Sequence, residues 1–97
     1  MAEPFVIRYS TEAANDIRAM RMFDRRKVLD GISDYLNHEP TRVSKSRIKL
    51  MVQPFWSQYR LRLDEFRIYY DIDNASHRVN ILRVLLKTTN PTPRESP

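Results

Sequence analysis

The chain has 97 residues, which is long enough for one compact domain with one hydrophobic core and too short for two. It is 41% hydrophobic and 30% charged, as is typical of a globular protein, and it lacks cysteine, which excludes disulfides, thiolate zinc sites and cysteine nucleophiles. The formal net charge of +5 favours a phosphate-rich or acidic partner, although from composition alone a merely soluble basic domain explains it equally well.

The N-terminal residues 1–8 do not have the basic-then-apolar layout of a secretory signal peptide. No uninterrupted apolar run approaches the length of about 20 residues that crosses a bilayer. We therefore expect a cytoplasmic protein that does not contact a membrane.

The N-terminal half of the sequence predicts one strand followed by two helices. Residues 5–9 form a β-branched and aromatic run after a proline, which is typical of a strand. Either Ser10 or Thr11 can cap the first helix, in which apolar residues recur at helical spacing over residues 13–20.

The second helix has the strongest helical periodicity in the chain. Asp24 is a candidate cap at its start, and Pro40 ends it. Gly31, the only glycine in the chain, lies inside this helix at some cost in helix propensity. The apolar face is expected to consist of Val28, Leu29, Ile32, Tyr35 and Leu36.

The C-terminal half predicts strands. A strand near residues 47–50 follows a polar loop, and residues 78–87 form a nearly continuous apolar run that is typical of a well-covered strand. Between them, Pro54 indicates a bend. The adjacent Phe55 and Trp56 are either lid residues of the core or part of a groove that binds another protein.

A hairpin is predicted over residues 58–72, where apolar and polar residues alternate strictly on both sides of a break at residues 64–65. A two-residue loop would set Leu63 opposite Phe66 and bring all the apolar residues onto one face. Like charges directly opposite each other are unfavourable. Their clustering therefore favours a bound polyanion, and a solvated outer face on which arginine stems are tolerated is the alternative. The polar face would carry Arg60, Arg62, Arg67 and Tyr69.

These elements predict an α+β fold: a small antiparallel sheet with two N-terminal helices packed on one face, in the order β-α-α-β-β-β. Residues 1–87 are expected to form a single domain. Residues 88–97 hold three of the six prolines and are expected to be a flexible tail.

This order of elements resembles the RelE/ParE superfamily of bacterial type II toxins. The most specific similarity is the hairpin, in which Y-R-L-R-L, an acidic turn and F-R-I-Y-Y follow one another. The helix that ends in Y-L-N-H-E-P and the R-I-K-L segment support it. The resemblance covers residues 5–87, which is nearly the whole predicted domain.

The resemblance implies one of two activities. RelE-like members are ribosome-dependent endoribonucleases, also called mRNA interferases, whereas ParE-like members poison DNA gyrase without nuclease chemistry. Both are held inactive by a cognate antitoxin. The leading interpretation is an mRNA interferase whose partners are the antitoxin, the ribosome and mRNA, with no cofactor and no metal. A gyrase inhibitor, or a degenerate toxin that only binds its antitoxin, is the alternative.

The family's site residues can be transferred by position. Arg67 matches the arginine that contacts the scissile phosphate, and Arg60 and Arg62 fall where RelE-like nucleases have two lysines. Lys87 lies approximately where they have a basic residue at the end of the last strand. Nothing after Tyr70 is aromatic, so the family's C-terminal tyrosine has no counterpart, which favours the gyrase alternative.

Guanidinium groups suit the stabilisation of a pentavalent phosphorane, but arginine stays protonated and is a poor general base. The candidate proton carriers are Tyr69 and, if its strand neighbours the hairpin, Lys49. Ordinary cross-strand packing against Arg60 is the alternative role of Tyr69. Arg83 interrupts an apolar strand and either emerges beside the other arginines or pairs with a carboxylate. The candidates for binding RNA phosphates are Lys49, Arg83 and Arg47.

Overall fold

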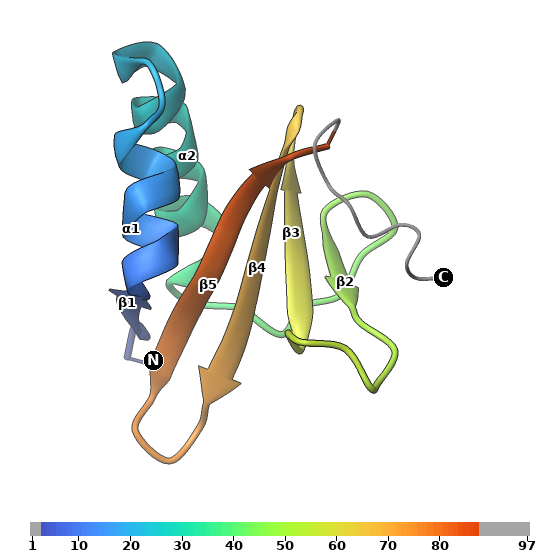
Figure 1. The fold of residues 1–97 in the computed structure, drawn as a ribbon. Helices are drawn as coiled ribbons and strands as arrows, with labels where there is room; N and C mark the ends of the chain where they lie inside the picture. The colour runs from blue at the N-terminus through green and yellow to red at the C-terminus, as the bar shows by residue number, and fades with distance from the viewer. Residues whose placement is uncertain (1–2, 88–97) are drawn as a thin grey trace.

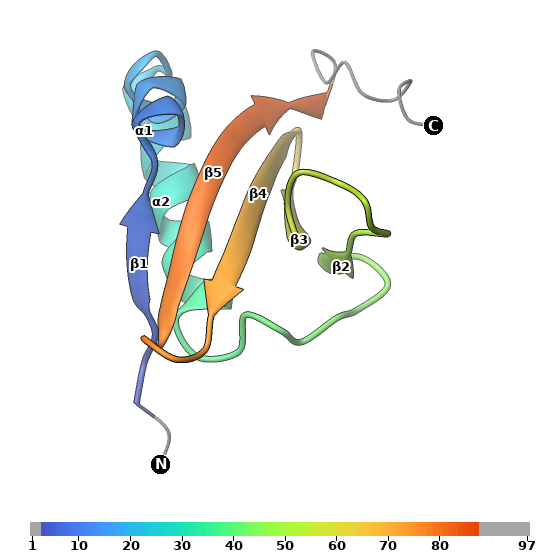
Figure 2. The same cartoon turned by 60° about the horizontal axis from the view of Figure 1, so that its bottom comes forward.

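The computed structural model describes residues 3–87 of the chain, so the expected tail over residues 88–97 lies outside the described residues. Two helices lie on the same side of a twisted sheet (Figure 1, Figure 2). Along the chain the elements are β1 (Val6–Tyr9), α1 (Thr11–Arg18), α2 (Met22–Leu36), β2 (Ile48–Leu50), β3 (Tyr59–Leu63), β4 (Phe66–Asp73) and β5 (Arg78–Leu86).

The five strands form one sheet in the order β1-β5-β4-β3-β2. The predicted α+β class, with both helices on one face, is confirmed. The sheet is mixed rather than wholly antiparallel, because β1 pairs parallel with β5, while the other neighbours are antiparallel. The strand predicted near residues 47–50 is present as the short β2, which pairs with β3, so the sheet has one strand more than the order β-α-α-β-β-β counts. Alternation along a strand indicates which face is buried but does not specify its partner or direction.

Ser10 caps the first helix as one of the two predicted candidates. Its Oγ accepts a hydrogen bond of 2.9 Å from the N–H of Ala13 and donates one of 2.8 Å to the carbonyl of Leu82 in β5. The prediction that Asp24 caps the second helix is wrong. The connection between the helices is so short that α2 begins at Met22, and Asp24 instead forms an ion pair of 3.3 Å with Arg21.

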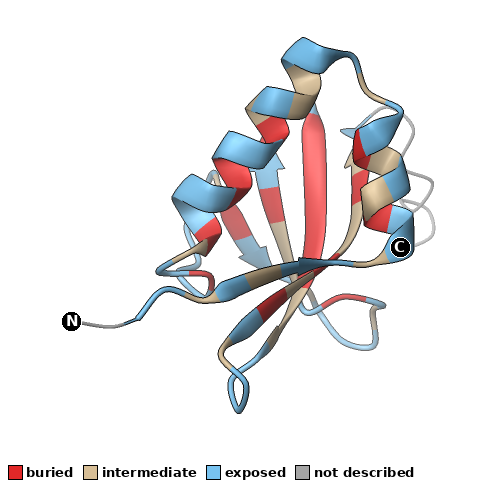
Figure 3. Cartoon of the chain, turned by 90° about the vertical axis from the view of Figure 1, so that its left-hand side faces the viewer, coloured by how far each residue is buried: buried red, intermediate tan, exposed pale blue. Residues whose placement is uncertain are grey.

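The hydrophobic core lies between the helices and the inner face of the sheet, where the buried residues of both layers face each other (Figure 3). Within α2, Val28, Ile32 and Leu36 are buried as predicted, whereas Leu29 and Tyr35 are exposed. A two-layer fold covers only one stripe of each helix, and that stripe is narrower than the apolar pattern suggests.

Gly31 lies where α2 approaches the hairpin most closely. A Cβ added at this position would overlap the δ carbons of Leu63 on β3. The absence of a side chain therefore allows the second helix to sit directly on the end of the hairpin, which offsets the cost of glycine in a helix.

Two kinds of feature are absent from the part of the chain that the structure describes. Among residues 3–87, no helix is both long and apolar enough to cross a membrane. In the same part of the chain, no group of three or more histidine, cysteine, aspartate or glutamate side chains is arranged to hold a metal ion.

Substitution of Gly31 by valine should lower the free energy of unfolding by about 1–3 kcal/mol, because the new side chain overpacks against Leu63. Urea denaturation followed by far-UV circular dichroism measures this loss. The matched control is Ser33→Val, which adds the same side chain at an exposed position of the same helix and should change stability by about 0.7 kcal/mol at most. Equal effects of the two substitutions would contradict close packing at Gly31.

Candidate functional site

The candidate site is built on the β3–β4 hairpin, whose register agrees with the prediction. Arg60 lies opposite Tyr69, and Arg62 lies opposite Arg67. The two-residue turn is closed by Asp64, which adopts a φ of 51° in the left-handed region that aspartate tolerates better than most residues.

The two faces of the hairpin carry side chains of opposite polarity. The apolar residues, such as Leu61 and Ile68, are fully buried against the helices. The opposite face carries Arg60, Arg62 and Arg67, which we call the arginine face. Among residues 3–87, none of these three arginines forms an ion pair with a carboxylate. The positive charge of this face is therefore not neutralised by the described part of the chain.

Arg67 is the most enclosed residue of the arginine face, with 6% of its surface exposed. Its Nη1 donates hydrogen bonds to the carbonyls of Asp64 at 2.7 Å and Phe66 at 3.0 Å, so the backbone of the turn fixes the guanidinium. Burial lowers the pKa of Arg67, and the charges of Arg60 and Arg62 lower it further. Arginine nevertheless remains protonated at neutral pH. The protein thus keeps the charged guanidinium of Arg67 in partly buried surroundings, next to two other cations, that disfavour its charge.

Arg60 has an unsatisfied donor. Its Nε is buried and has no hydrogen-bond partner in the described part of the chain. A buried donor that lacks an acceptor costs about 1–3 kcal/mol. Arg60 lies between Lys49 on β2 and Tyr69 on β4, so a second cation lies beside it on this face of the sheet.

The structure brings Lys49 and Lys87 to the neighbourhood of the arginine face. Lys49 is a candidate proton carrier only if its strand neighbours the hairpin. It does, because β2 pairs with β3, and Lys49 is exposed opposite Arg60. Lys87 follows β5 and is exposed, and its backbone N–H donates a hydrogen bond of 2.8 Å to the carbonyl of Glu65 in the hairpin turn.

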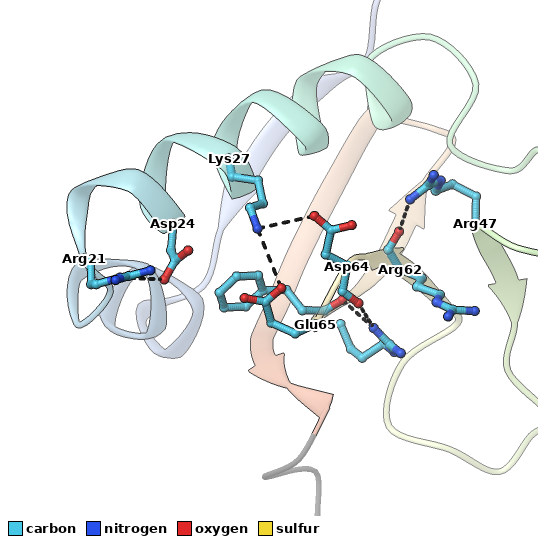
Figure 4. A network of polar contacts seen from close by, with 9 residues as sticks. Arg21, Asp24, Lys27, Arg47, Arg62, Asp64 and Glu65 are labelled. Atoms are coloured by element: carbon cyan, nitrogen blue, oxygen red, sulfur yellow. Dashed lines mark hydrogen bonds and ion pairs between the residues drawn. The ribbon is translucent and has the colours of Figure 1, made fainter.

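Two of the predicted phosphate-binding residues do not join the cluster. The guanidinium of Arg47 lies 5.1 Å from the centre of the Tyr35 ring of α2, and its Nη1 donates to the carbonyl of Arg62 at 3.0 Å (Figure 4). Arg83 donates two hydrogen bonds, of 2.8 and 2.9 Å, to the carboxylate of Asp16 on α1. Of the two alternatives for Arg83, pairing with a carboxylate is therefore confirmed.

An aromatic cluster lies beside the arginines. Tyr69 is only 1% exposed, because the loop before β3 folds across this part of the outer face. The centre of the Trp56 ring is 4.6 Å from that of Tyr69, and Phe55 stacks on Trp56 at 5.1 Å. Phe55 and Trp56 thus act as a lid over Tyr69 and not over the core between the layers. The sequence signal for this lid is the pair of aromatic residues directly after Pro54.

The turn of the hairpin is also held from the helix side. The Nζ of Lys27 on α2 lies 3.3 Å from a carboxylate oxygen of Asp64 and 3.6 Å from one of Glu65 (Figure 4). Desolvation lowers the pKa of Lys27, but the hydrogen bond that its ammonium donates to Asp64 and the charges of Glu65 and Asp24 outweigh it and raise the pKa overall. Both acidic side chains of the turn thus face α2 and leave the arginine face positive.

Comparison with solved structures identifies the fold. The chain is 26% identical to a chain of the RelBE2 toxin–antitoxin complex from Mycobacterium tuberculosis, with a TM-score of 0.76 over 89% of this chain and 94% of that one. The isolated E. coli RelE toxin gives 14% identity and a TM-score of 0.66 over 95% and 94%. The archaeal RelE–RelB complex from Pyrococcus horikoshii gives 16% and 0.60 over 86% and 94%. No protein-family model and no curated protein matches the sequence.

Tripolyphosphate should raise the melting temperature of the protein, because a polyanion bound to the arginine face relieves the repulsion of Arg67 by Arg60 and Arg62. At about 100 times its Kd, the ligand should add about 2.7 kcal/mol, and each kcal/mol raises Tm by about 4–8 °C. Differential scanning fluorimetry at constant ionic strength measures the shift.

The double substitution Arg60→Gln with Arg62→Gln should remove most of this stabilisation. Arg42→Gln is the matched control, because Arg42 is an exposed arginine that already pairs with Glu39. If sodium chloride of equal ionic strength, or the double variant, gave the same rise, the arginine face would not be an anion site.

Proposed function

Because the chain has the RelE-like fold, we propose that it is the toxin of a bacterial type II toxin–antitoxin system and that a cognate antitoxin is its partner. The similar structure from Mycobacterium tuberculosis is itself a toxin–antitoxin complex and has the highest identity among those compared above. The family resemblance of the hairpin, which was evident from the sequence, points in the same direction.

We further propose that the toxin is a ribosome-dependent mRNA interferase. One observation carries this proposal: three guanidinium groups share one sheet face, and within residues 3–87 no carboxylate pairs with them. Arg67 would hold the scissile phosphate, since backbone carbonyls already fix its guanidinium. Arg60, Arg62 and Lys87 would add positive charge that stabilises the developing phosphorane.

The general base requires a group that can lose a proton, which excludes the arginines. Lys49 fits this role better than Tyr69. Lys49 is exposed and lies opposite Arg60, so a 2′-hydroxyl can reach it, whereas Tyr69 is almost fully covered. We therefore propose Lys49 as the base and a structural role for Tyr69 under the aromatic lid. The ribosome would contribute by aligning the message, since correct placement alone lowers a barrier by as much as about 7–11 kcal/mol.

The alternative is a ParE-like inhibitor that binds DNA gyrase. The absence of the C-terminal tyrosine favours it, because only the nuclease mechanism needs that side chain. The arginine face favours the nuclease, because its clustered cations suit phosphate oxygens. In cells, mRNA cuts that require ribosomes mark the nuclease, while gyrase-trapped breaks and a DNA-damage response mark the inhibitor.

Arg67→Ala should abolish growth arrest on induction while the protein still folds and binds its antitoxin. Loss of one preorganised donor to the transition state typically lowers a rate by about 100- to 1,000-fold. Primer-extension mapping of transcripts after induction measures cleavage directly. Arg42→Ala, which removes an exposed arginine that pairs with Glu39, is the matched control and should keep full activity. An Arg67→Ala protein that arrests growth as well as the parent disproves the role of Arg67.

Lys49→Arg should keep RNA affinity but lower cleavage by about 100- to 10,000-fold, because arginine retains the charge and cannot accept the proton. Single-turnover cleavage on programmed ribosomes measures the rate of each variant.

Tyr69→Phe is the companion variant and should cleave normally, because it removes only the phenol oxygen. A strong loss in Tyr69→Phe together with normal cleavage in Lys49→Arg would reverse the two assignments.

A further inference from the structure

The loop before β3 presents a large aromatic surface to solvent next to the arginine face. Trp56, the only tryptophan of the chain, is 47% exposed, although one side of its ring contacts Tyr69 at a centroid distance of 4.6 Å. Phe55 stacks on Trp56 at 5.1 Å with an angle of 26° between the rings. The three rings therefore form a continuous aromatic stack of which Trp56 is the exposed member.

This loop is held by its own polar groups. Gln53 donates from Nε2 to the carbonyls of Met51 at 3.3 Å and Ser57 at 3.2 Å, and its Oε1 accepts the N–H of Phe55 at 3.3 Å. The buried Ser57 donates from Oγ to the carbonyl of Tyr59 at 3.2 Å. The exposed indole is thus fixed in place, and binding at this surface would lose little conformational entropy.

The end of the loop is anchored to β4, the central strand of the sheet. The N–H of Gln58 donates to the carboxylate of Asp71 at 2.7 Å, and its side-chain oxygen accepts the N–H of Ile72 at 2.8 Å. The orientation of Trp56 relative to β4 is therefore determined by hydrogen bonds on both sides of the aromatic pair, and not only by the contact with Tyr69.

The neighbours of the aromatic stack are the cations of the site. Tyr69, on which Trp56 rests, lies opposite Arg60, and its phenol is close enough to Arg67 to affect the pKa of that residue. Single-stranded nucleic acids are bound by this combination of chemistry, in which aromatic side chains stack on the bases and positive groups follow the backbone.

A lid whose function was only to cover Tyr69 would not need a tryptophan that leaves half of its surface in water. Phe55 has the same apolar character and is itself better covered than Trp56. Exposed hydrophobic residues that occur singly need no explanation. Trp56 differs from such residues because it lies on a fixed loop, continues an aromatic stack and borders uncompensated positive charge.

We propose that Trp56 is a base-stacking residue for single-stranded RNA: its indole stacks on a base of the strand whose adjacent phosphate binds Arg67 and Arg60. Phe55 and Tyr69 support the indole from behind. The proposal rests on the proposed nuclease function only in identifying the polyanion as RNA. It makes Trp56 a positioning residue that holds the message across the arginine face.

The single tryptophan permits a direct test, because the tryptophan emission of the full chain reports on position 56 alone. The protein is titrated with a 2′-O-methylated single-stranded RNA pentamer, which binds but cannot be cleaved, and separately with tripolyphosphate. Stacking predicts that the RNA quenches the tryptophan emission and that tripolyphosphate competes with the RNA without quenching. RNA binding detected by anisotropy of a labelled pentamer without any change in tryptophan emission would overturn the stacking role.

Variants separate stacking from folding and from charge. Trp56→Leu should lower RNA affinity by about 5- to 100-fold and leave tripolyphosphate affinity unchanged, while Trp56→Phe should retain most of the RNA affinity. Phe23→Leu is the matched control, because Phe23 is 70% exposed on α2 and should not affect RNA. Equal losses of RNA and tripolyphosphate affinity in Trp56→Leu would indicate a structural role and overturn the proposal.

The outcomes also distinguish this inference from the proposed function. If the parent chain does not bind the RNA at all, the stacking role fails, and the proposed function is decided separately by the mapping of transcripts after induction. If RNA binds without involving Trp56, only the stacking role fails, because the test of Arg67 by growth arrest does not depend on position 56.

Discussion

The structure depends on the β3–β4 hairpin having one apolar face and one polar, positively charged face. Full burial of one large aliphatic or aromatic side chain contributes about 1.5–3 kcal/mol, and the hairpin buries Leu61, Leu63, Phe66 and Ile68 against the helices. The unfavourable pairing of Arg62 with Arg67 is on the scale of a single cross-strand contact, about 0.2–1 kcal/mol. The core therefore fixes the register, and the like charges on the outer face cannot change it, because a shift by one residue would expose the whole apolar set.

The rest of the fold reinforces this arrangement at two places. Lys27 on α2 attracts both acidic residues of the hairpin turn toward the helices, which keeps these carboxylates away from the arginine face. On β5, Arg83 donates to the carboxylate of Asp16 from α1, which also accepts the N–H of Val84 at 2.9 Å, so this acidic residue is already paired. The positive charge that remains on the outer face follows from the placement of these partners rather than from the net charge of the chain.

The parts of the fold that were predictable from the sequence are those set by local pattern. Period-two alternation gave the register of the hairpin, and the cap at Ser10 followed from residue type. The parallel pairing of β1 with β5, the exposure of Tyr35 and the partner of Arg47 were not predictable, because each is decided by a segment distant in sequence. The sequence indicated the two aromatic residues of the lid but not that they cover Tyr69, because that contact depends on how the loop folds over the outer face of the sheet.

Under the proposed function, the electrostatics that suit RNA would suit other anions as well. Arg67 keeps its charge in a partly desolvated position beside Arg60 and Arg62, so the free protein holds a repulsion that a well-placed anion relieves. A carboxylate supplied by a bound protein forms paired hydrogen bonds with a guanidinium group as a phosphate does. The charge of the arginine face therefore favours anions in general, and the choice between a phosphate and a carboxylate must come from the groups around it, such as the exposed Trp56 beside Tyr69.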